Sequence, residues 1–188
     1  MSTPEAPEEG LATAVLEIER HAAEAGWDQP ARLFALVDTA RLVASEPQLA
    51  ETLGGAPLTP VEQEGLVPGR ALEDQLTSIS WPGTVLGCAA LVERVVLPPE
   101  VEAQLPDEPA SVATFAAEHP DRHEVRIVVG ATRGGASYCA LRMRAHDSDD
   151  SVLTGPDLVP GLLALVRGTL DDLDDLDDPG AAGGTPDE

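Results

Sequence analysis

Residues 124–144, EVRIVVGATRGGASYCALRMR, contain the pattern that decides the fold. Two runs rich in branched and apolar residues, 124–130 and 136–144, flank Arg133-Gly134-Gly135. A three-residue loop with glycine at the position that needs a left-handed backbone is typical of a β-hairpin. The sequence therefore predicts two antiparallel strands joined at this loop.

The two faces of the predicted hairpin differ in chemistry. Counting back from the loop places three apolar pairs on one face: Val125/Met143, Ile127/Leu141 and Val129/Cys139. The other face receives Glu124/Arg144, Arg126/Arg142, Val128/Ala140 and Gly130/Tyr138. Alternation of this kind predicts that the first face lies in the core and that the second is solvated or covered by a polar element.

Helices are predicted at both ends of the chain. Apolar residues recur every three or four positions over 11–25, where Gly26 suits a left-handed C-cap. The same spacing over 157–170 predicts a buried stripe made by Leu158, Leu162, Val166 and Leu170. Shorter helices are expected at 69–79 and 110–118.

The segments between these elements complete an α+β fold. A strand is predicted over 85–97, and Pro98-Pro99 must end it because proline cannot donate to a ladder. Segment 31–37 is compatible with a helix or a strand; the strand is favoured, with Asp38 capping a helix over 39–53. Residues 54–68, with three Gly and three Pro, are predicted to be a loop.

We expect an α+β fold in which an antiparallel meander of 85–97, 124–130 and 136–144, joined by 31–37 if it is extended, packs its apolar face against the terminal helices. The length suits one domain, placed at 10–176. Residues 1–9 and 177–188 are acidic and poor in apolar residues, which predicts disordered tails.

Charge excludes some partners. Asp and Glu number 34 against 11 arginines, which gives a net charge of −23, so polyphosphate is repelled and nucleic acid is not expected as a partner. Leu, Val, Ile and Phe together number 46 of 188, above the roughly 20 % below which charged chains tend to be disordered. The chain contains no lysine and no asparagine, which indicates a GC-rich bacterial genome.

A cytoplasmic location is expected, because the first residues lack the basic and apolar regions of a signal peptide and no apolar run is long enough to span a membrane. Cys88 and Cys139 are predicted to be inert buried thiols that face one core region from adjacent strands. The oligomeric state is left open.

Motifs for catalysis and cofactor binding are absent. There is no G-x-S-x-G, G-x-G-x-x-G or G-x-x-x-x-G-K-[ST], and without lysine neither a P-loop nor Schiff-base chemistry is available. We expect no cofactor and favour a non-enzymatic protein. The alternative is a metal-dependent hydrolase that uses the acidic loop 146–157, with Asp147, Asp149, Asp150 and Asp157 as ligands, although its spacing does not fit an EF-hand.

Arginines form the candidate binding site. Residues 119–144 contain five arginines against two acids, and the predicted register sets Arg126 directly opposite Arg142, near Arg144 and Tyr138. Like charges opposed across a ladder destabilise it unless an anion neutralises them. Either internal acids such as Glu93 do so, which is favoured, or the four residues bind an acidic or phosphorylated ligand.

The chain also resembles a known family. The resemblance is carried by GWDQPARLFALVDT (26–39), SWPG (80–83), LVERVVLPPE (91–100), HPDRHEVR (119–126) and LTGPDLVPGL (153–162). These strings are similar to a family of acidic actinobacterial proteins of this length, known as conserved hypothetical proteins. The resemblance implies an α+β domain in a cytosolic setting and supplies no catalytic residues. The expected function is a binding, adaptor or chaperone-like domain with an unidentified protein partner.

Overall fold

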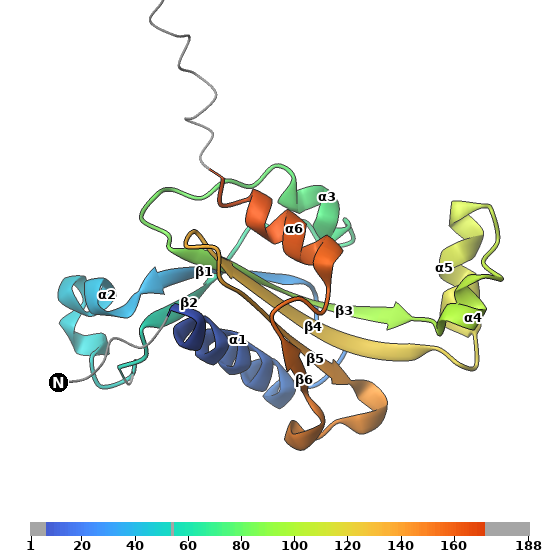
Figure 1. Cartoon of the computed structure of the whole chain (residues 1–188), viewed down its shortest axis with the longest axis horizontal. Coiled ribbons are helices and arrows are strands. Elements are labelled where there is room, and N and C mark those ends of the chain that lie inside the picture. Colours follow the sequence, from blue (N-terminus) through green and yellow to red (C-terminus); the bar gives the residue numbers. More distant parts are fainter. Residues whose placement is uncertain (1–6, 54, 172–188) are drawn as a thin grey trace, which may run out of the picture.

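The hairpin lies within a six-stranded antiparallel sheet in the computed structural model, which describes residues 7–53 and 55–171 (Figure 1). Neighbouring strands follow the order β2-β1-β3-β4-β5-β6. The strands are β1 (Arg32–Asp38), β2 (Leu58–Gln63), β3 (Gly87–Val96), β4 (His123–Thr132), β5 (Ser137–Met143) and β6 (Leu153–Gly155). The α+β fold with terminal helices packed on an antiparallel sheet is therefore confirmed.

The described part of the chain also contains six α-helices and three short 3₁₀ turns, of which the first precedes β1 and the last follows β6. They are α1 (Pro7–Glu24), α2 (Thr39–Ser45), η1 (Pro47–Leu49), α3 (Leu72–Leu76), α4 (Pro99–Glu102), α5 (Pro109–Glu118), η2 (Arg144–His146), η3 (Asp149–Ser151) and α6 (Pro160–Gly168). Helix α1 begins at Pro7, within the segment 1–9 that was expected to be a tail. The rest of that segment and the tail 177–188 lie outside the described residues.

The predicted register of the hairpin is confirmed from Val125/Met143 to Gly130/Tyr138, whereas the predicted pair Glu124/Arg144 is not part of the ladder, because β5 ends at Met143 and Arg144 begins η2. Val125 faces Met143, Arg126 faces Arg142 and Val129 faces Cys139. Gly135 adopts φ +91°, the left-handed conformation that the loop requires. Because one residue of slip would exchange the two faces, this register fixes which side chains enter each core.

The favoured reading of segment 31–37 is also confirmed. It forms β1, and the Asp38 side chain accepts a hydrogen bond of 3.0 Å from the backbone N–H of Arg41. Helix α2 ends at Ser45 rather than at residue 53, because Pro47 follows and opens a 3₁₀ turn.

The prediction of a loop over 54–68 is wrong, because this segment contains β2. Strand β2 lies at the edge of the sheet and pairs with β1, with Val61 opposite Ala35. Proline is tolerated on an edge strand, where its missing N–H removes few ladder bonds, so Pro60 does not prevent pairing.

The two terminal helices cover opposite faces of the sheet (Figure 1), whereas the sequence predicted both on one face. Helix α6 packs on the apolar face, with buried Leu162 and Val166 beside Val129 and Cys139. Helix α1 packs on the arginine face. Its apolar partners there are Phe34, Leu36, Ala89, Leu91, Val128 and Ala140. This face carries enough apolar area near the middle of the sheet to hold a helix, which the sparse pattern of the hairpin alone did not indicate.

Leu158 is the one member of the predicted α6 stripe that does not enter the core, since it is 41 % exposed. Helix α6 begins only at Pro160, so Leu158 precedes the helix and its side chain lies over Gly155 instead. Trp81 and Leu141 are half-buried and pack against the apolar cluster under α6.

Candidate functional site

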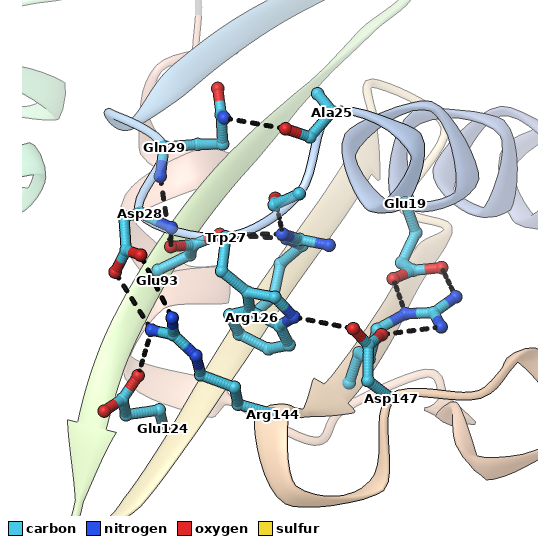
Figure 2. A network of polar contacts seen from close by, with 12 residues as sticks. Glu19, Ala25, Trp27, Asp28, Gln29, Glu93, Glu124, Arg126, Arg144 and Asp147 are labelled. Atoms are coloured by element: carbon cyan, nitrogen blue, oxygen red, sulfur yellow. Dashed lines mark hydrogen bonds and ion pairs between the residues drawn. The ribbon is translucent and has the colours of Figure 1, made fainter.

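Arg126 and Arg142 are buried on the face of the sheet that α1 covers, and Arg144 lies nearer the surface, beside Asp28 in the loop that follows α1 (Figure 2). Arg126 is fully buried and Arg142 is 2 % exposed, whereas the side chain of Arg144 is 40 % exposed. The structure therefore brings these three together. Tyr138 does not join them and packs against the apolar cluster under α1.

Arg126 is neutralised by Glu93, the acid that the sequence favoured. The two residues face each other across β3 and β4, and Arg126 Nη2 and Nε lie 2.8 and 3.1 Å from Glu93 Oε1. The Trp27 ring lies 4.4 Å from the guanidinium carbon, a cation–π contact. Arg126 Nη2 also donates to the carbonyl of Gly26, which follows α1 with φ +87°. The C-cap glycine predicted after the first helix thus brings the chain down onto this arginine.

Arg142 is neutralised by Glu19, which the sequence analysis missed. Its Nε and Nη2 donate to the two oxygens of Glu19 at 2.6 and 2.9 Å, a bidentate pair. Asp147 and Asp149 accept further bonds of 3.2 and 2.7 Å. The pKa of Arg142 is raised above its ordinary value, chiefly by the hydrogen bonds that it donates to Glu19.

A signal for Glu19 was present in the sequence. Glu19 lies four residues after Val15 and three before Ala22, on the apolar stripe of α1. A carboxylate on a buried stripe requires a cationic partner, and a buried arginine is the usual one.

Arg144 completes this set at the surface. Its Nη1 donates to Asp28 at 2.9 Å and to Glu124 at 2.5 Å, and these hydrogen bonds raise the pKa of the arginine. The Trp27 indole N–H donates to Asp147 at 2.8 Å. Since Asp147 also binds Arg142 and the Trp27 ring contacts Arg126, Trp27 connects the two buried arginines. We call these three arginines and their carboxylates the arginine network (Figure 2). The positive charge of the three arginines, for which an external anion was the alternative, is therefore neutralised by carboxylates of the chain itself.

The acidic loop supplies part of this network. Asp147 and Asp149 bind Arg142, while Asp150 and Asp157 are exposed. Within residues 7–53 and 55–171 no three His, Cys, Asp or Glu side chains are grouped as a metal site would need. Of the four candidate ligands, two therefore form ion pairs with Arg142 and the other two are exposed to solvent.

A second candidate site is an apolar groove of about 900 Å³ on the face that α6 shares. Strands β1 and β2 form its floor through Ala35, Val37, Val61 and Gln63. Helix α2 forms one wall and residues 81–85 form the other. We call it the β1–β2 groove. A smaller pocket of about 310 Å³ adjoins it and shares Gln63 and Trp81 with it.

Arg133 fixes the wall at 81–85. From the hairpin loop it donates to the carbonyls of Trp81 and Val85 at 2.8 and 2.9 Å and to that of Leu170. The Trp81 indole N–H donates to Thr169 at 3.0 Å. The wall is thereby tied both to β4 and to the end of α6, so the groove is preformed.

A family assignment follows from comparison with known proteins. The family model of PPA1309-like proteins matches residues 11–171, which include all the elements described above except the first four residues of α1. The chain belongs to this family. No curated protein and no solved structure matches the chain. The PPA1309-like assignment thus supports the resemblance inferred from the sequence and supplies no activity.

The two thiols of this PPA1309-like chain are buried. Burial raises the pKa of the Cys88 thiol to about 11, although the Thr169 hydroxyl lies 3.2 Å from its sulfur. The expectation that the cysteines lie on adjacent strands is wrong, because β4 separates β3 from β5. Among the described residues no helix has both the length and the apolar character needed to cross a bilayer.

Acid is expected to loosen the arginine network. Hydrogen bonds from Arg144 lower the pKa of Asp28, and those from Trp27 and then Arg142 lower the pKa of Asp147. A carboxyl whose pKa is depressed by folding stabilises the fold fully above its ordinary value, 3.8, and this stabilisation is lost as the pH falls through the lowered pKa. Urea unfolding between neutral pH and about pH 2 should show this loss, and Asp147→Asn should reduce it. An Asp147→Asn chain with the unchanged pH profile would contradict the assignment.

Proposed function

We propose that this PPA1309-like chain is a non-enzymatic binding protein that holds a segment of another protein in the β1–β2 groove. The supporting observation is the groove itself, an open apolar hollow of about 900 Å³ beside α6. Val61, on its floor, is 38 % exposed. Concave, mainly apolar hollows of several hundred Å³ are where proteins bind ligands.

Chemistry in the groove favours binding over catalysis. Its lining has neither histidine nor cysteine, so no His-activated hydroxyl or thiol is available there. Asp38, the carboxylate of the lining, accepts the backbone N–H of Arg41 as a helix cap. The hydrolase alternative is weakened because Asp147 and Asp149 bind Arg142.

Net charge selects another protein as the occupant. A chain with a net charge of −23 repels a second copy of itself, and it also repels nucleic acid. The groove has β1 and β2 as its floor and is lined mainly by apolar side chains, which suits a length of polypeptide that covers the floor with several side chains.

Site-specific photo-crosslinking in the native cell tests this proposal. Benzoylphenylalanine at Val61 should give a discrete crosslinked product with a second protein. The matched control is Leu153, an exposed apolar residue on β6, the strand at the opposite edge of the sheet from β2. Equal products from both positions, or no product from Val61, would overturn the proposal.

A further inference from the structure

We infer that the segment bound in the β1–β2 groove is apolar and basic, with Lys or Arg side chains that contact acids around the groove and the ring of Trp81. This inference rests on the proposed function and adds the chemistry of the partner. Trp81 lines both the groove and the smaller pocket beside it, so the two hollows form one surface. The charges and the exposed ring on this surface select the occupant.

The charge around this surface is negative. Residues 38–85, which include α2, β2, α3 and the wall at 81–85, contain seven acids and two arginines, Arg41 and Arg70. Two of the acids pair with arginines of β1 and β3. The other five acids and both arginines have no ion pair among the described residues. Acids therefore remain in excess after every ion pair of this region is counted.

Three exposed acids are left when each arginine of the two linings is matched by the acid of the same lining. They are Glu46, Glu51 and Asp74, and we call them the rim acids. Glu46 directly follows Ser45, the last groove residue of α2, and Asp74 directly precedes Gln75 of the pocket lining. A basic segment is attracted both by the rim acids and by the net charge of the whole chain, −23.

The side chains of the segment matter because backbone pairing at this edge of the sheet is impaired. The carbonyl of Leu36 accepts the N–H of Leu86, on the β3 side of β1. Pro60, which faces Leu36 across β1 and β2, therefore directs its backbone away from β1, toward the open edge. Since proline has no N–H, a strand added at this edge would find no donor at the middle of β2. The segment must gain its affinity from side chains in the groove.

Trp81 provides a second contact for a cation. Its indole N–H is bonded to Thr169, so the half-buried side chain presents mainly its ring to a partner. Tryptophan is the best aromatic partner for the cation–π contacts of lysine and arginine, and the ring also contacts apolar side chains. Arg133 holds this wall in place before binding, which lowers the ordering cost.

Panning a display library of random peptides on the full-length protein tests the inference. We expect the enriched peptides to combine apolar residues with Lys or Arg. Their association rate, measured by stopped-flow fluorescence, should fall as salt is added, because salt screens the attraction. Val61→Arg, which adds a positive charge and a long polar side chain to the groove floor, should abolish binding.

A triple variant tests the rim acids. Glu46→Gln/Glu51→Gln/Asp74→Asn should slow association of the enriched peptides about tenfold, as loss of complementary charges at the rim of an interface does. The expected effect is on the association rate, since the apolar contacts that slow dissociation are unchanged.

The matched control is Glu17→Gln/Asp150→Asn/Asp157→Asn, which makes the same change in net charge. These acids are exposed and have no ion pair among the described residues. Glu17 lies on α1, which covers the other face of the sheet, and the two aspartates flank β6, at the opposite edge from β2. This variant should slow association less than about twofold, because these charges are screened from the groove.

Four results would each overturn the inference: enriched peptides that are acidic or uncharged, equal slowing by the two triple variants, normal binding to the Val61→Arg protein, or no enrichment at all. The proposed function is tested separately by the crosslink from Val61 in the cell. If that crosslink forms, the proposed function stands whatever the panning gives, and without it the proposed function falls on its own.

Discussion

The substitution Arg142→Met is expected to lower the free energy of unfolding by about 3–5 kcal/mol, as breaking a buried ion pair does. Glu19 is 2 % exposed and receives its bidentate hydrogen bonds from Arg142 at 2.6 and 2.9 Å. Methionine fills much of the space of the arginine but donates nothing. The carboxylate of Glu19 would be left in the interior without a counter-ion. Urea denaturation monitored by circular dichroism measures the loss.

The double variant Glu19→Leu/Arg142→Met tests the cause. Removing both charges replaces a buried pair by apolar side chains, which is often neutral for stability, so the double variant should recover most of the loss. Arg144→Met, which alters the half-exposed arginine of the same network, should cost much less. A double variant as unstable as Arg142→Met alone would show that packing, and not the unpaired carboxylate, causes the loss.

Local patterns predicted the centre of this fold well. The hairpin register followed from a three-residue loop and strict alternation, and Asp38 marked the boundary between β1 and α2. In each case the determinants lie within a few residues of one another. Such local preferences predict the final structure well because the tertiary contacts of the folded chain agree with them.

Contacts between distant segments were harder to predict. Glu19 and Arg142 are 123 positions apart, so only the unusual place of a carboxylate on the α1 stripe could have indicated a buried cation. Strand β2 was missed because Pro60 and the flanking glycines indicate a loop, and the edge position that tolerates proline is a property of the assembled sheet.

The β1–β2 groove could not be predicted for the same reason. It exists because α6 packs on β3 and β4 and leaves the β1–β2 end of that face open beside α2. Its floor residues gave no signal in the sequence, because Val37 is an ordinary apolar residue of a predicted strand and Val61 lies in the segment that was predicted to be a loop. Which face a helix covers depends on how well the shapes of both surfaces fit. On the face that α1 covers, the fit depends at one position on a residue with no side chain beyond a hydrogen atom.

That position is Gly130, where Gly130→Ala is expected to destabilise the fold by about 1–3 kcal/mol, the usual cost of overpacking. A Cβ atom there would lie 2.6 Å from Val15 Cγ2 and 3.0 Å from Leu11 Cδ1, both buried on α1. Valine in a helix has one strongly preferred rotamer, so its methyl cannot rotate away cheaply. Helix α1 must move off the sheet or the side chains must leave their rotamers. Urea denaturation measures the change.

Gly134→Ala is the matched control, since its Cβ would meet only the Thr132 hydroxyl at 3.7 Å and it should change stability by less than about 0.5 kcal/mol. Val15→Ala removes the methyl that Gly130→Ala strikes. In the double variant the two substitutions should therefore cost less than the sum of their separate losses, because the new methyl occupies the space that Val15 vacates. Strict additivity would mean that α1 is not held against β4 at this point. The close approach of Glu19, on the next turn of α1, to Arg142 would then not depend on the packing of Val15 against Gly130.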